Sequence, residues 1–222
     1  LVTTAERLRN VPSMKATITT QCLDVSSLSD RIGRLAKPAL DAAPDCEAGL
    51  TALIETIARL RAPSLAEASL GRADLVVASL VLTQLHIEVL RAAERLFSAR
   101  FGVTGPLGSS LKWREAALDL ALRIQDGFIA GLDASTQPGG RVFLSATVAV
   151  AEVALDGDVW TTPGWYQTTA TPRLHDAVAR ASSNLVPTLG GTWPFAPTRP
   201  SKGSGGVLYR VEGLVLEHRA RA

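Results

Sequence analysis

The sequence contains very little cysteine, with Cys22 and Cys46 as the only two in 222 residues. Two cysteines cannot build the disulfide framework of a small secreted protein, and no His/Cys cluster has the spacing of a zinc site. We therefore expect reduced thiols, no bound metal and a cytoplasmic protein. Long apolar runs are missing as well, because none approaches the roughly 20 residues that a membrane-spanning helix needs.

Several catalytic motifs are also missing. The sequence has no G-x-S-x-G elbow of a serine hydrolase, no P-loop and no G-x-G-x-x-G loop of a dinucleotide-binding oxidoreductase. The net charge of +2, without a polybasic block, neither requires nor excludes a nucleic-acid partner. What remains is a chain that is 46% hydrophobic and 20% charged, which is typical of a folded protein. Its length predicts a single domain over 1–222.

The order of residue patterns predicts the fold class. Residues 16–26 are rich in threonine, isoleucine and valine and predict a strand, and residues 74–79 form a short apolar run of the kind found in strands covered on both faces. Helical periodicity follows over 80–101, and apolar strands are expected again at 141–153 and 207–219. Helical crossovers between apolar strands predict an α/β three-layer sandwich with a mainly parallel, twisted sheet and a C-terminal antiparallel hairpin.

Candidate site residues lie where the expected strands end, because ligands of such sheets bind at the carboxyl ends of the strands. Asp24 closes the first expected strand, and its carboxylate is a suitable acceptor for a ribose diol or an adenine amino group. Ala78, Ser79 and Leu80 close the next one. Small side chains at such a position let a ligand approach the backbone closely.

Three segments resemble one protein family. Residues 73–85, "ADLVVASLVLTQL", resemble the fourth-strand motif of class I S-adenosylmethionine-dependent methyltransferases. Residues 137–147, "QPGGRVFLSAT", are similar to the fifth strand with its preceding glycine turn, and residues 207–219, "VLYRVEGLVLEHR", to the last, antiparallel strand. The resemblance implies a Rossmann-like methyltransferase domain that uses S-adenosylmethionine and transfers a methyl group to a small molecule, an RNA or a protein.

The resemblance also implies roles for the candidate residues. Asp24 would bind the ribose hydroxyls if its strand is the family's second, or the adenine amino group if it is the third. Ala78, Ser79 and Leu80 would line the methionine end of the cofactor. The alternatives are a turn or helix cap for Asp24 and an ordinary strand-to-helix junction for the other three.

One part of the family pattern is not found. The acidic residue and glycine-rich loop that follow the first strand have no counterpart between Leu1 and Asp24. We expect an N-terminally truncated copy, since the chain begins without methionine. The alternatives are a partner that supplies the loop and a domain that no longer binds cofactor. The alternative function is a catalytically silent Rossmann-like domain that acts as a binding or assembly module.

Further candidates concern the substrate. His86 follows the fourth-type strand closely enough to act as a base, with an ordinary half-buried histidine as the alternative. Trp160, Trp165 and Tyr166 lie in residues 156–172, which together with 190–206 are expected to form loops on the substrate side. Their rings could stack on a planar substrate or pin a long loop to the domain.

Overall fold

The computed structural model of the chain describes residues 27–61, 71–79, 81–82, 84–102, 107–156, 159–161, 164–167, 173–196 and 206–219. The helices are α2 (Ser27–Ala42), α3 (Cys46–Arg59), α4 (Ile87–Phe101), the short η2 (Leu107–Ser109), α5 (Leu111–Ala134) and α6 (Leu174–Ala181). The strands are β1 (Ala73–Ser79), β2 (Thr136–Asp156), β3 (Val159–Thr161), β4 (Tyr166–Gln167), β5 (Leu185–Phe195) and β6 (Gly206–His218). The strand predicted over 16–26, with Asp24, and the position Leu80 lie outside the described residues.

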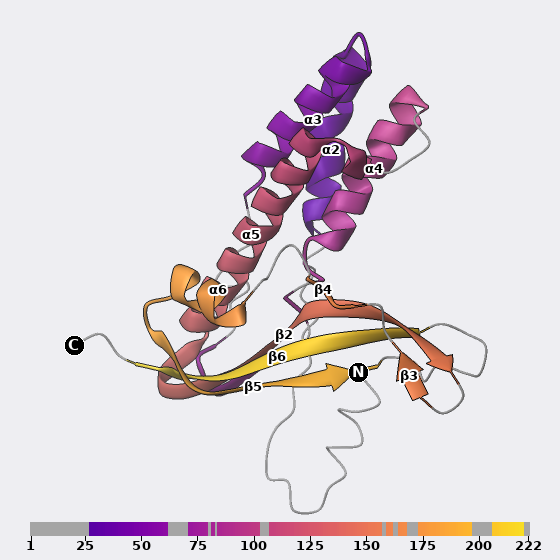
Figure 1. Ribbon diagram of the computed structural model, residues 1–222. Coiled ribbons are helices and arrows are strands. Elements are labelled where there is room, and N and C mark those ends of the chain that lie inside the picture. Colours follow the sequence, from indigo (N-terminus) through magenta and orange to yellow (C-terminus); the bar gives the residue numbers. More distant parts are fainter. Residues whose placement is uncertain are drawn as a thin grey trace, which may run out of the picture.

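The main strands form a mixed sheet in the order β1-β2-β6-β5 (Figure 1). β1 is parallel to β2, whereas β6 is antiparallel to both of its neighbours, β2 and β5. It follows that β1, β2 and β5 run in one direction and β6 alone runs in the other. The prediction of a mainly parallel sheet therefore holds for the direction of these strands but not for their hydrogen-bonded pairs, of which only β1–β2 is parallel. The short strands β3 and β4 pair with the far end of β2.

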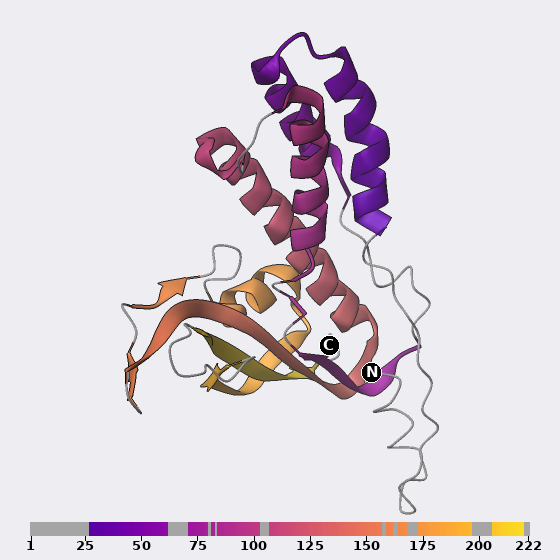
Figure 2. The same ribbon diagram turned by 90° about the vertical axis from the view of Figure 1, so that its right-hand side faces the viewer.

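The described helices all lie on one side of the sheet, as the two perpendicular views show (Figures 1 and 2). α5 and α6 make the main contacts with the strands, and α2, α3 and α4 pack on one another, with α3 also packed on α5, in a bundle that extends away from the sheet. The expectation of a three-layer sandwich is therefore not met among the described residues, which form two layers. Accordingly Leu75 and Val77, on the side of β1 away from the helices, are 62% and 63% exposed.

One hydrophobic core cluster runs from the helical bundle to the helix-facing side of the sheet. In the bundle, apolar residues one helical turn apart, such as Leu28 and Ile32 in α2, are fully buried. In the sheet, alternate residues such as Leu144 and Leu216 are buried beneath the helices. α5, with 24 residues, belongs to both parts and connects them. No described helix is long and apolar enough to cross a membrane.

Several element boundaries differ from the sequence predictions. The helix expected over 80–101 begins at Ile87, after a turn. Residues 137–140 are not a separate turn but part of β2, where Gly139 has a φ of +80° that favours glycine. Of the segments expected as substrate-side loops, 156–172 contains the short strands β3 and β4, and the first part of 190–206 belongs to β5. Residues 197–205, between β5 and β6, lie outside the described part.

Candidate functional site

The carboxyl ends of β1 and of the β2 segment beside it are the place where the sequence predicts a ligand. The parallel register pairs Ala78 with Leu144 and Ser79 with Ser145. Because side chains alternate along a strand, Ser79 and Ser145 lie on the side away from the helices, and their Oγ atoms are 3.1 Å apart in a hydrogen bond. Ser79 is exposed while Ser145 is fully buried. The pair therefore offers one accessible hydroxyl at the end of β1.

Ala78 has a different environment from Ser79. Its side chain is buried and belongs to the hydrophobic core cluster beneath the helices. The small residue therefore serves the packing of the helical layer, and at 4% exposure neither its side chain nor its backbone offers a ligand much surface. Among the described strands β1 is an edge strand, so its outward N–H and C=O groups have no strand partner there.

The side of the sheet away from the helices is apolar. Phe143 of β2 and Val215 of β6 are paired there, next to Leu189 of β5. The indole of Trp193 lies against Gly213, because a Cβ atom at this glycine would stand 2.6 Å from Cη2 of Trp193. We refer to this surface, formed by Leu75, Val77, Phe143, Leu189, Trp193 and Val215, as the open face.

The aromatic candidates lie along the distal half of β2. Tyr166, in β4, pairs with Val150 and is 58% exposed. Val150 is five residues beyond Ser145, which corresponds to roughly 17 Å along an extended strand. The ring of Trp165 contacts the guanidinium of Arg210 at 4.4 Å from the ring centroid. Trp160 lies in β3, and its side chain is outside the described part.

These positions separate the aromatic candidates from the pair Ser79–Ser145. The cation–π contact of Trp165 is the kind of contact that holds a loop to the body of a domain, so the geometry favours the pinning role for this residue.

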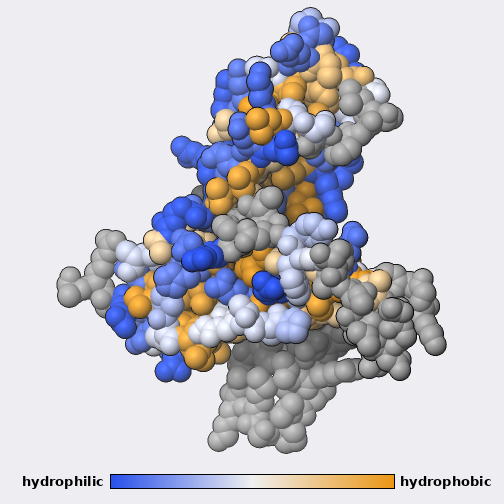
Figure 3. All heavy atoms as spheres, viewed as in Figure 1, coloured by the Kyte–Doolittle hydropathy of each residue, from blue (hydrophilic) through white to orange (hydrophobic). Residues whose placement is uncertain are grey.

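Seen from the side of Figure 1, hydrophilic residues predominate on the outside of the helical layer, and hydrophobic residues also reach the surface at the level of the sheet (Figure 3).

His86 stands at the start of α4, in the N-cap position, without a side-chain capping bond. Its Nδ1 is buried and has no hydrogen-bond partner among the described residues. Burial lowers the pKa of His86 from its ordinary value of 6.5, so the imidazole is uncharged at neutral pH. The ring lines a cavity of about 430 Å³ between α4 and α5. The structure thus places His86 in the helical layer rather than on the open face.

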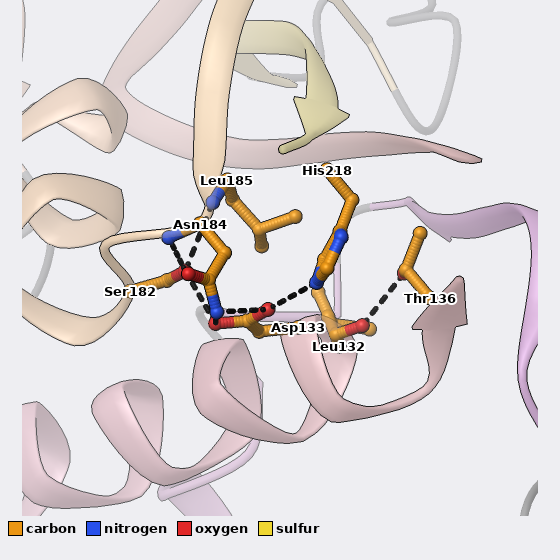
Figure 4. Close-up of polar contacts among 7 residues, drawn as sticks. All are labelled: Leu132, Asp133, Thr136, Ser182, Asn184, Leu185 and His218. Atoms are coloured by element: carbon orange, nitrogen blue, oxygen red, sulfur yellow. Dashed lines mark hydrogen bonds and ion pairs between the residues drawn. The ribbon is translucent and has the colours of Figure 1, made fainter. Parts of the chain in front are cut away.

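A polar cluster that the sequence reasoning missed lies where α5, α6, β5 and β6 meet (Figure 4). The carboxylate of Asp133 accepts hydrogen bonds from Ser182 Oγ at 2.7 Å and from Asn184 Nδ2 at 3.2 Å. His218 Nε2 lies 2.9 Å from the same carboxylate, and the side chains of His218 and Asp133 are only 11% and 15% exposed. The alternation of β6 places Leu214, Leu216 and His218 on one side, which was the available signal.

The cluster contains a serine, a histidine and an aspartate but does not have the geometry of a catalytic triad. Both Ser182 and His218 bind Asp133, whereas in a triad the histidine lies between the other two. Ser182 Oγ also accepts hydrogen bonds from the backbone N–H groups of Asn184 and Leu185, each at 3.1 Å. The arrangement joins the end of α5 to the strands, which is a structural role.

In the part of the chain that the structure describes, no three or more His, Cys, Asp or Glu side chains lie together so that they could hold a metal ion. A comparison of the sequence with models of known protein families finds no match, and a comparison with curated proteins finds none either.

Proposed function

We propose that the chain is an S-adenosylmethionine-dependent methyltransferase domain of Rossmann-like fold. The observation that supports this proposal is the direction of the strands. The three segments that resemble the family, β1, β2 and β6, are neighbours in one sheet. β1 and β2 are parallel, and β6 is antiparallel to both of its neighbours, as the resemblance implies for a last strand.

The described residues fit one wall of a cofactor site at the end of β1. Ser79 offers an exposed hydroxyl at the end of β1, which is an edge strand among the described strands, whereas Ala78 is buried in the core. Asp24 and Leu80, which lie outside the described residues, would complete this wall. Asp24 would accept hydrogen bonds from the ribose hydroxyls or from the adenine amino group.

The chemistry would consist largely of positioning. S-adenosylmethionine, when bound, supplies a sulfonium methyl group to a nucleophilic atom of the acceptor. The residues of this chain would hold the reactants in line and exclude water, and such reactions often need no dedicated base. The acceptor, whether a small molecule, an RNA or a protein, and the oligomeric state stay open in this proposal.

Calorimetric titration of the chain with S-adenosylmethionine and S-adenosylhomocysteine tests the proposal. We expect saturable binding of both ligands, weakened about tenfold or more by Asp24→Ala, because a hydrogen bond to a charged group contributes ~1.5–3 kcal/mol. Asp30→Ala, in the first turn of α2, is the matched control and should leave the affinity unchanged. Absence of binding by the unmodified chain would contradict cofactor binding by this chain and favour the catalytically silent module. Unchanged affinity in Asp24→Ala would mean that Asp24 is only a turn or helix cap.

The second candidate is a binding or assembly module without catalysis, and the open face favours it. Leu75 and Val77 are each more exposed than apolar side chains of a strand in a covered sheet. As an assembly module the chain would self-associate through this face. Sedimentation velocity should then show a dimer that Val77→Glu disrupts and that Leu35→Glu, at a 50% exposed leucine of α2, leaves intact. A monomer at all concentrations would count against this candidate.

A further inference from the structure

A cavity, which we call the slot, lies between residues of α4 and α5. Its volume is about 430 Å³, within the size range of small-molecule pockets. Both His86 and Glu94 line it from the α4 side, and their eight-residue separation corresponds to roughly 12 Å along a helix. Leu111, Trp113 and Leu118 line it from α5. A cavity that extends this far along α4 has room for an elongated molecule.

Apolar side chains form the rim of this slot and remain accessible. Leu111 and Leu118 are 61% and 38% exposed, although they lie seven residues apart on the same side of α5. Leu90 of α4 lines the slot opposite them. A ligand that covers these leucines removes apolar surface from water, which favours an aromatic or other apolar body.

Polar groups stand at the two ends of the slot. At one end the imidazole of His86 is uncharged at neutral pH, because burial lowers its pKa. At the other end Trp113 Nε1 donates a hydrogen bond of 3.3 Å to Glu94 Oε1 and fixes that carboxylate. Glu115 and Arg114 also line the slot, so that its two carboxylates exceed its one guanidinium and an anionic ligand is disfavoured.

We propose that the slot between α4 and α5 is a binding site for an uncharged aromatic molecule with a hydroxyl group at one end. The ring lies between Leu90 and Leu118, and the hydroxyl forms a hydrogen bond with the imidazole of His86. A hydroxyl suits this partner because it donates to an acceptor nitrogen and accepts from a protonated one, whichever tautomer the imidazole has. The site does not depend on the proposed methyl transfer, and no cofactor is required for binding.

Calorimetry of the full chain at pH 7.5 with 2-naphthol and 2-methylnaphthalene tests the proposal. The two probes have the same ring and similar size, but only 2-naphthol can form the hydrogen bond. We expect 2-naphthol to bind up to about tenfold more tightly, the value of one buried hydrogen bond. His86→Phe should abolish this preference, because it retains a ring at the site and removes both nitrogens.

Variants at the exposed rim keep the test independent of any folding defect at His86. Leu111→Glu should weaken the binding of both probes by about tenfold, through lost apolar contact, while Leu35→Glu on α2 should not change it. Three outcomes overturn the proposal. They are the absence of saturable binding, a preference for 2-naphthol that persists in His86→Phe, and equal weakening by the two glutamate variants.

Discussion

The two faces of the sheet carry similar apolar side chains, but the described helices cover only one of them. On the helix-facing side Val142, Leu144 and Leu216 are fully buried. On the open face Leu75 and Leu189 are 62% and 69% exposed. Full burial of such a side chain contributes ~1.5–3 kcal/mol of free energy. A layer or molecule that covered the open face would therefore be stabilised by hydrophobic contact with these side chains.

The difference is clearest within β1. Ala78 faces the core, while Val77, its neighbour in the chain, points to the other side and is 63% exposed. The strand has the continuous apolar sequence of one covered on both faces, yet the described helices cover one. The second functional candidate, the assembly module, starts from this mismatch, because a second molecule would cover the same surface.

The largest expected effect comes from removing a side chain on the covered face. Leu144→Ala should lower the free energy of unfolding by about 3 kcal/mol, since it leaves a cavity in the core. Leu189→Ala, the same change at an exposed leucine of β5, should cost less than about 0.5 kcal/mol. Urea denaturation followed by circular dichroism measures both. If the two variants lose similar stability, the open face is covered in solution and the comparison between the faces fails.

The fold could be predicted in outline because hydrophobic periodicity records burial. The apolar runs of β1, β2 and β6 identified those strands at or within a few residues of their observed positions. The number of layers could not be predicted, since an apolar run does not reveal how many of its faces are covered. β5 was missed over most of its length because glycines and prolines at 187–194 are typical of irregular structure, yet this strand pairs with β6 through Phe195.

A somewhat smaller effect is expected at the junction that attaches the helical layer to the covered face. Asp133→Ala should destabilise the protein by about 2–3 kcal/mol, because Ser182, Asn184 and His218 lose their common acceptor in a largely buried place. Asp126→Ala is the matched control. It removes the exposed pair with Arg180, and we expect a loss of at most about 1 kcal/mol.

Thermal unfolding of these two variants measures the difference. Equal shifts in Tm would mean that the cluster around Asp133 is no stronger than a surface ion pair.

The candidate site could be predicted only in part. The pattern that predicts a strand lies in neighbouring residues, whereas the side chains that meet in a site come from residues far apart in the sequence. Ser79 was found as the last residue of an apolar run, and its contact with Ser145, which is 66 residues away, required the parallel register. The grouping of Asp133 with His218 likewise depends on how α5 meets β6. His86 was singled out by its residue type and by its place soon after β1, and the slot that it lines depends on how α4 and α5 lie in the bundle.

The smallest expected effect concerns the open face itself, where Trp193 lies on Gly213. Gly213→Ala would place a Cβ atom 2.6 Å from Cη2 of Trp193, so the indole must move outward. We expect a loss of about 1 kcal/mol, at the lower end for overpacking because the ring is already partly exposed, and a red shift of tryptophan fluorescence. Gly191→Ala, on the neighbouring strand, has no atom within 4 Å of the new Cβ and should be neutral or slightly stabilising. A red shift of the same size in both variants would show that Trp193 does not rest on Gly213 in solution, and the open face would then be more exposed than the described contact implies.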